Sequence, residues 1–149
     1  MLKQIKYIVI HCTATPAGRE LSKKDLERMH KGQPPHGRGW KHFGYHYLVH
    51  LNGEVEQLQP LNEDGWIEDA EIANGVKGYN DCSIHIAYVG GCDAYTGKPK
   101  DTRTTAQKNA LRKLVRSCSQ IAPSASIKGH RDFPGVKKAC PCFDVATQL

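Results

Sequence analysis

The sequence lacks any long hydrophobic run. The chain has 149 residues, and no window of about 20 of them is apolar enough to cross a bilayer. Insertion into a membrane is therefore not expected. The apolar run near the N-terminus stops at His11, too short for the core of a signal peptide, and no small-residue cleavage site follows it. We therefore expect either synthesis in the cytoplasm without a signal peptide or the removal of a leader before residue 1.

Basic tracts with interleaved aromatic residues are also missing. Lysine and arginine total 21 against 15 aspartates and glutamates, a formal net charge of +6. Without such a tract, nucleic acid is not an expected partner. The charge favours other polyanions, such as an anionic membrane surface or the bacterial wall with its carboxylate-bearing peptides. A surplus of solvated lysines explains the same charge equally well.

Repeats, low-complexity tracts and linkers are absent too, and the length is that of one ordinary domain. We expect one domain over residues 1–149, acting as a monomer. Hydrophobic patterning and turn signals predict its elements. These are a buried central strand over 5–12, a helix from Ser22, hairpin strands over 45–51 and 54–59 around Asn52-Gly53, a strand over 83–89, a helix over 104–121 and a short strand near 126–129.

The two predicted helices have clear amino-terminal signals. Ser22 begins the first, with Leu26 and Met29 expected to face inward, and Thr104 with Gln107 forms a capping box for the second. The second helix has an apolar stripe made of Leu111, Leu114, Val115, Cys118 and Ile121. The order of strands and helices predicts an α/β fold, with a central mixed β-sheet flanked by helices.

The six cysteines are too sparse for a small disulfide scaffold. Cys12 lies in an apolar strand and Cys118 on an apolar helix face, which indicates two buried free thiols. Cys140 and Cys142 flank one proline and are too close for an easy mutual disulfide, but one of them is suited to binding a metal. We expect no structural disulfide.

Eight histidines are many for a chain of this size. His11 ends a predicted buried strand, and His130 ends another and is followed ten residues later by Cys140. Two imidazoles and a thiolate, with a position left for water, are typical of a catalytic zinc site. The spacing alone is not specific. Five of the other six have ordinary interpretations as helix-end, loop or strand residues: His30, His36, His42, His50 and His85. The sixth, His46, is expected to lie in the core or to support a ligand from behind.

Six short segments form an ordered set of motifs. They are His11-Cys12-Thr13-Ala14-Thr15, Gly44-Tyr45-His46-Tyr47, Lys77-Gly78-Tyr79-Asn80 with the strand to Val89-Gly90-Gly91, Thr105-Ala106-Gln107, Gly129-His130-Arg131-Asp132, and Lys138-Ala139-Cys140-Pro141-Cys142-Phe143-Asp144. In the same order, they resemble motifs of the zinc-dependent N-acetylmuramoyl-L-alanine amidases of the phage-lysozyme and peptidoglycan-recognition type. Each segment alone is weak evidence for this resemblance, but the ordered set covers nearly the whole chain. The chain departs from that pattern at Asn74-Gly75-Val76, where relatives often carry histidine or tryptophan.

The resemblance implies a metal centre. His11, His130 and Cys140 match the zinc ligands of the family, which implies one Zn²⁺ per chain. Cys142 lies where phage relatives have serine, so the resemblance assigns the ligand to Cys140. The expected role of Cys142 is that of a small buried side chain.

The resemblance also implies a reaction, the hydrolysis of the amide bond between N-acetylmuramic acid and L-alanine in bacterial peptidoglycan. Zinc polarises such a carbonyl and lowers the pKa of a water toward ~7. Tyr45 and Lys138 match the two residues that these amidases need around this water, Tyr45 to manage its proton and Lys138 to stabilise the oxyanion. Asp132 and Asp144 are candidates for orienting ligands.

Two other functions are compatible with the same resemblance. Some members of the superfamily bind the stem peptide without cutting it, typically after losing a zinc ligand, and some phage relatives also inhibit a polymerase. All three ligands together with Tyr45 and Lys138 are present here, which favours the enzyme. The implied protein is an endolysin-like hydrolase that acts on the cell wall after release or export.

Overall fold

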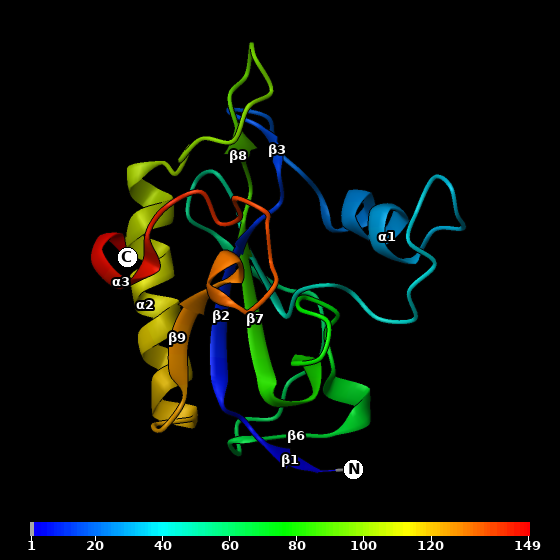
Figure 1. Cartoon of the computed structure of the whole chain (residues 1–149), viewed down its shortest axis with the longest axis vertical. Coiled ribbons are helices and arrows are strands. Elements are labelled where there is room, and N and C mark those ends of the chain that lie inside the picture. Colours follow the sequence, from blue (N-terminus) through cyan, green and yellow to red (C-terminus); the bar gives the residue numbers. More distant parts are fainter. Residues whose placement is uncertain (1) are drawn as a thin grey trace.

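A five-stranded mixed sheet forms the centre of the structure, a computed structural model that describes residues 2–149 (Figure 1). Its strand order is β5-β4-β7-β2-β9, and every neighbouring pair is parallel except the β4–β5 hairpin. The strands are β2 (Tyr7–Cys12), β4 (Tyr47–Val49), β5 (Val55–Gln57), β7 (Ser83–Tyr88) and β9 (Ser126–Gly129). The predicted mixed α/β sheet is confirmed.

Shorter elements surround this sheet. Two pairs of two-residue strands join distant parts of the chain: β1 (Lys3–Gln4) with β6 (Trp66–Ile67), and β3 (Thr15–Pro16) with β8 (Gly91–Cys92). The helices are α1 (Lys23–Lys31), α2 (Thr105–Ile121) and α3 (Val145–Gln148), with 3-10 turns η1 (Asp69–Glu71), η2 (Asn80–Cys82) and η3 (His130–Asp132). Over residues 2–149, no helix combines the length and the apolar character needed to span a membrane.

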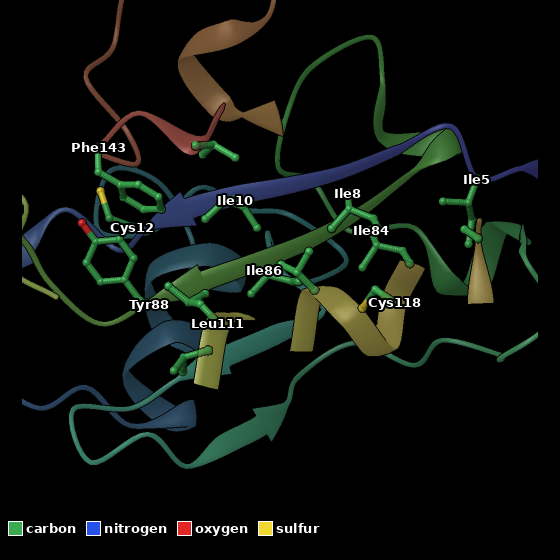
Figure 2. Packing of buried hydrophobic residues seen from close by; sticks show 14 of the residues in the cluster. Ile5, Ile8, Ile10, Cys12, Ile84, Ile86, Tyr88, Leu111, Cys118 and Phe143 are labelled. Atoms are coloured by element: carbon green, nitrogen blue, oxygen red, sulfur yellow. The ribbon is translucent and has the colours of Figure 1, made fainter. Parts of the chain in front are cut away.

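Helix α2 covers one face of the sheet. Side chains alternate between the faces of a strand, so the isoleucines of β2 and β7 point toward the helix. In Figure 2 they meet Leu111 and Cys118 of α2 in one cluster. Burying each such aliphatic side chain contributes about 1.5–3 kcal/mol to stability. The alternate residues of the same strands, including Val9 and His11, therefore face away from α2.

Both long helices begin as the sequence predicts. Ser22 caps α1 in a capping box with Asp25, and Thr104 caps α2 in a capping box with Gln107. Leu26 is buried as expected, but the prediction for Met29 is wrong, since its side chain is 39% exposed. His30, one residue further along α1, takes the inward position instead.

All six cysteines are free thiols. Titration of the denatured chain under non-reducing conditions, with a chelator present, is therefore expected to count six reactive thiols. A parallel sample reduced beforehand provides the control and gives the same number. A count of four or fewer in freshly purified protein would show a structural disulfide and contradict this prediction.

Candidate metal centre and active site

Two histidines lie side by side where neighbouring parallel strands end. Ile10 of β2 pairs with Gly129 of β9, so the next residue in each chain segment, His11 and His130, lies at the same sheet edge. The two imidazole centroids are 4.8 Å apart. His11 is buried and His130 half-buried. Parallel pairing thus brings together residues 119 positions apart in the sequence.

A loop after η3 brings Cys140 to the same edge. The backbone N–H of Arg131 donates to the carbonyl oxygen of Cys140 at 2.9 Å. The backbone N–H of Cys12 donates to the Cys140 Sγ at 3.2 Å. Gly129 permits this approach, because a Cβ at that position would lie 2.8 Å from Pro141 Cδ. As a result the Cys140 Sγ lies 3.8 Å from His11 Nδ1.

The resulting cluster fits a zinc ion. The ligand atoms of His11, His130 and Cys140 all lie within 4.8 Å of one another. Burial, followed by the positive charges of His130 and Lys138, holds the pKa of His11 well below its usual range. Burial and then Lys138 also lower the pKa of His130. Both imidazoles are therefore neutral near pH 7, the form that binds metal.

Cys142 takes a different position from Cys140. Its backbone is left-handed, with φ of 71°. Its Sγ lies 3.9 Å from Cys12 Sγ and donates to the carbonyl oxygen of Gly91 at 3.3 Å. Burial raises the pKa of the Cys142 thiol to about 12. This half-buried side chain packs against the hydrophobic core beside the cluster of candidate metal ligands.

Tyr45 lies beside the cluster of His11, His130 and Cys140, just before β4. Its ring centroid is 5.2 Å from that of His11 and 5.2 Å from that of His30. Its hydroxyl donates to the carbonyl oxygen of Cys12 at 3.4 Å. Burial raises the pKa of Tyr45, so its hydroxyl keeps a proton to donate. His30 also accepts a hydrogen bond from the backbone N–H of Gly44 at 3.0 Å, which ties α1 to this segment.

Lys138 lies two residues before Cys140, exposed on the loop that carries this thiol. The Lys138 side chain lines the same groove as Tyr45 and the three-residue cluster. The groove has a volume of about 980 Å³, and its lining also includes the cations Arg38, Lys77 and Lys137. The groove is therefore suited to an anionic substrate. The segment at Asn74, where the sequence departs from the family pattern, lies in its wall.

The two aspartates considered as ligand-orienting residues have local roles. Asp132 accepts a hydrogen bond from the backbone N–H of Gly129 at 2.8 Å, which stabilises the turn that presents His130. Asp144 caps α3 by accepting from the backbone N–H of Ala146 at 3.2 Å.

Sequence reasoning missed one histidine of the site. His85 of β7, interpreted as an ordinary strand residue, is fully buried, and its Nδ1 lies 2.9 Å from His11 Nε2. Its other ring nitrogen, Nε2, lies 3.0 Å from Asn80 Oδ1. Side chains alternate between the two faces of β7, so His85 points away from the isoleucines of that strand. This alternation can be read from the sequence. Only the β2–β7 pairing shows that His11 is its neighbour.

The fold and the cluster together define a class of protein. It is an α/β domain with a three-ligand cluster of catalytic composition at one edge of a mixed sheet, open to a basic groove. The N-acetylmuramoyl-L-alanine amidase family matches residues 1–143. The chain belongs to this family and is a peptidoglycan amidase, as the motifs predicted.

Individual relatives agree with this assignment. The chain is 34% identical to an endolysin of Klebsiella phage KP32, over 96% of this chain and 84% of the relative. The solved structure of the endolysin from the Thermus scotoductus bacteriophage Ph2119 is similar, with a TM-score of 0.71, 29% identity, and coverage of 93% of this chain and 78% of the other. The Drosophila protein PGRP-LB shares the fold, with a TM-score of 0.66 at 20% identity, over 95% of this chain and 79% of the other.

Proposed function

We propose that the chain hydrolyses the amide bond between N-acetylmuramic acid and L-alanine with one zinc ion, held by His11, His130 and Cys140. The observation that carries the proposal is the convergence of these three side chains, whose ligand atoms lie within 4.8 Å of one another in the wall of the groove. Two imidazoles and one thiolate with an open position are the composition of a catalytic rather than a structural zinc site. When bound, zinc supplies Lewis-acid chemistry by acidifying water and polarising a carbonyl.

Tyr45 is proposed to orient the reacting groups through its hydroxyl. Its ring packs against His11 and His30, which restricts where Oη can lie. Because the phenol keeps its proton, Oη can donate a hydrogen bond to a water or to the scissile carbonyl at the cluster. The acceptor that Oη has in the present structure, the Cys12 carbonyl at 3.4 Å, is a long and weak one.

Lys138 is proposed to stabilise the negative charge that develops on the carbonyl oxygen. Its positive charge lies close enough to the cluster to lower the pKa of both His11 and His130. Such a charge is worth more to the transition state than to the ground state, because the oxyanion forms only as the bond is attacked. The other cations of the groove, Arg38, Lys77 and Lys137, are proposed to attract the carboxylates of the stem peptide.

Digestion of purified peptidoglycan tests this function. The zinc-loaded chain is expected to release stem peptides with a free L-alanine amino terminus, identified by mass spectrometry. Chelator-treated chain should release none, and activity should return when zinc is added back. Cleavage at another bond, or full activity after verified removal of the metal, would contradict the proposal. Binding without cleavage, across several peptidoglycan types, would instead support a recognition module.

A further inference from the structure

His85 lies in direct contact with a proposed zinc ligand. It is fully buried on β7 and faces the same side of the sheet as His11 on β2. The His11 Nε2 and His85 Nδ1 atoms are 2.9 Å apart, so one of them donates a proton to the other. The direction of this hydrogen bond decides which nitrogen of His11 is left with a lone pair.

Asn80 determines that direction. Its Oδ1 accepts a hydrogen bond from the backbone N–H of Val76 at 2.7 Å, which requires the oxygen rather than the amide nitrogen at that position. The same Oδ1 lies 3.0 Å from His85 Nε2. Because a carbonyl oxygen can only accept, the proton of this contact lies on His85 Nε2.

The position of this proton on His85 determines which nitrogen of His11 is protonated. A neutral imidazole carries one N–H, so a His85 ring protonated at Nε2 has a lone pair at Nδ1. His85 Nδ1 must then accept the Nε2 proton of His11. His11 is left with its lone pair on Nδ1, the atom that lies 3.8 Å from Cys140 Sγ and points into the cluster.

The surroundings of His85 hold its ring in this position. A Cβ at Gly75 would lie 2.3 Å from His85 Nδ1 and 2.6 Å from its Cε1, so the ring occupies the space that a side chain at position 75 would need. The backbone N–H of His85 donates to His46 Nδ1 at 3.0 Å, and His46 Nε2 donates to the carbonyl oxygen of Glu71 at 2.6 Å. The ring stacks on that of His46, with an interplanar angle of 5°.

We propose that His85, oriented by Asn80, is a positioning residue of the metal centre that accepts the Nε2 proton of His11 and so presents the Nδ1 lone pair of His11 to the metal. This inference rests on the proposed zinc site. It also gives a reason for the glycine at position 75, since any side chain there would displace the ring that orients His11. Residues that orient metal ligands in this way typically contribute about 10- to 100-fold to metal affinity.

Two measurements on a matched set of variants test this role. The first is ¹⁵N NMR of histidine-labelled, metal-free protein, which reports the protonated nitrogen of each ring. The second is the dissociation constant for zinc, measured by competition with a chromophoric chelator. The variants are His85→Leu, which removes the acceptor, His85→Asn, whose Oδ1 can replace Nδ1, and Gly75→Ala, which displaces the ring. His50→Gln is the control, since it removes an imidazole whose ring nitrogens contact Glu20 and Glu56 rather than His11 or His85.

In the metal-free wild-type protein, His11 is expected to be protonated at Nε2 and unprotonated at Nδ1. His85→Leu and Gly75→Ala should weaken zinc binding about 10- to 100-fold, whereas His85→Asn and His50→Gln should stay within a few-fold of wild type. A His11 proton on Nδ1 in the wild-type protein, or unchanged zinc affinity in both His85→Leu and Gly75→Ala, would overturn the inference. Failure of the wild-type chain to bind zinc would contradict the proposed function instead, while the NMR measurement still reads the tautomer.

Discussion

The Cys140→Ser variant is expected to lose its zinc and, with it, all measurable amidase activity, whereas Cys142→Ser keeps both. A serine hydroxyl is protonated at neutral pH and is a far weaker zinc ligand than a thiolate. Cys140 Sγ lies in the cluster with His11 and His130, while Cys142 Sγ lies against Cys12 and Gly91. The change at position 140 therefore removes a ligand, and the change at position 142 removes a packing contact.

Elemental analysis after dialysis measures this difference. Wild type and Cys142→Ser should contain about one zinc per chain, and Cys140→Ser close to none. His11→Ala should also contain none, because it removes a second ligand from another element of the fold. Circular dichroism of each variant shows whether the fold is kept. Zinc retained in Cys140→Ser but lost in Cys142→Ser would show that the other thiol is the ligand.

Lys138→Ala is expected to lower turnover about 100- to 1000-fold, equivalent to about 3–4 kcal/mol, which is typical for the loss of an oxyanion donor. The variant should keep its zinc and its affinity for peptidoglycan, since Lys138 is exposed and lies outside the three-ligand cluster. An interaction made mainly in the transition state changes turnover while ground-state binding is little affected. Tyr45→Phe should show the same separation, because it removes only the hydroxyl.

Lys137→Ala provides the matched control for this experiment. Lys137 is exposed, carries the same charge and lines the same groove, one residue away. Its removal should weaken substrate binding modestly and leave turnover near that of wild type. Equal losses of turnover in the two lysine variants would indicate a general electrostatic effect of the groove. Wild-type turnover in Lys138→Ala would remove that lysine from the mechanism.

Much of the fold could be predicted because its signals are local. The β4–β5 hairpin forms around Asn52-Gly53, as the turn dipeptide predicts, and Ser126–Gly129 is a strand as expected. Ser22 and the Thr104–Gln107 capping box mark the two helix starts correctly. The two-residue strands at Lys3–Gln4 and Trp66–Ile67 could not be predicted, because each exists only through its pairing with a distant segment.

The site could be predicted in part. The structure brings His11, His130 and Cys140 together beside Tyr45 and Lys138, but this convergence depends on the parallel pairing of β2 with β9, which no local pattern contains. His85 was missed for the same reason, because its contact with His11 depends on the order of strands. The metal-binding and catalytic roles, the one-domain monomer and action on the wall after release stay predictions.

Anomalous X-ray diffraction at the zinc absorption edge tests the metal centre most directly. Crystals of the zinc-loaded chain are predicted to show one anomalous peak bonded to His11 Nδ1, to a ring nitrogen of His130 and to Cys140 Sγ, with zinc–nitrogen distances of about 2.0–2.1 Å and a zinc–sulfur distance of about 2.3 Å. A peak bonded to Cys142 Sγ, or zinc bound elsewhere with none at these three residues, would contradict it.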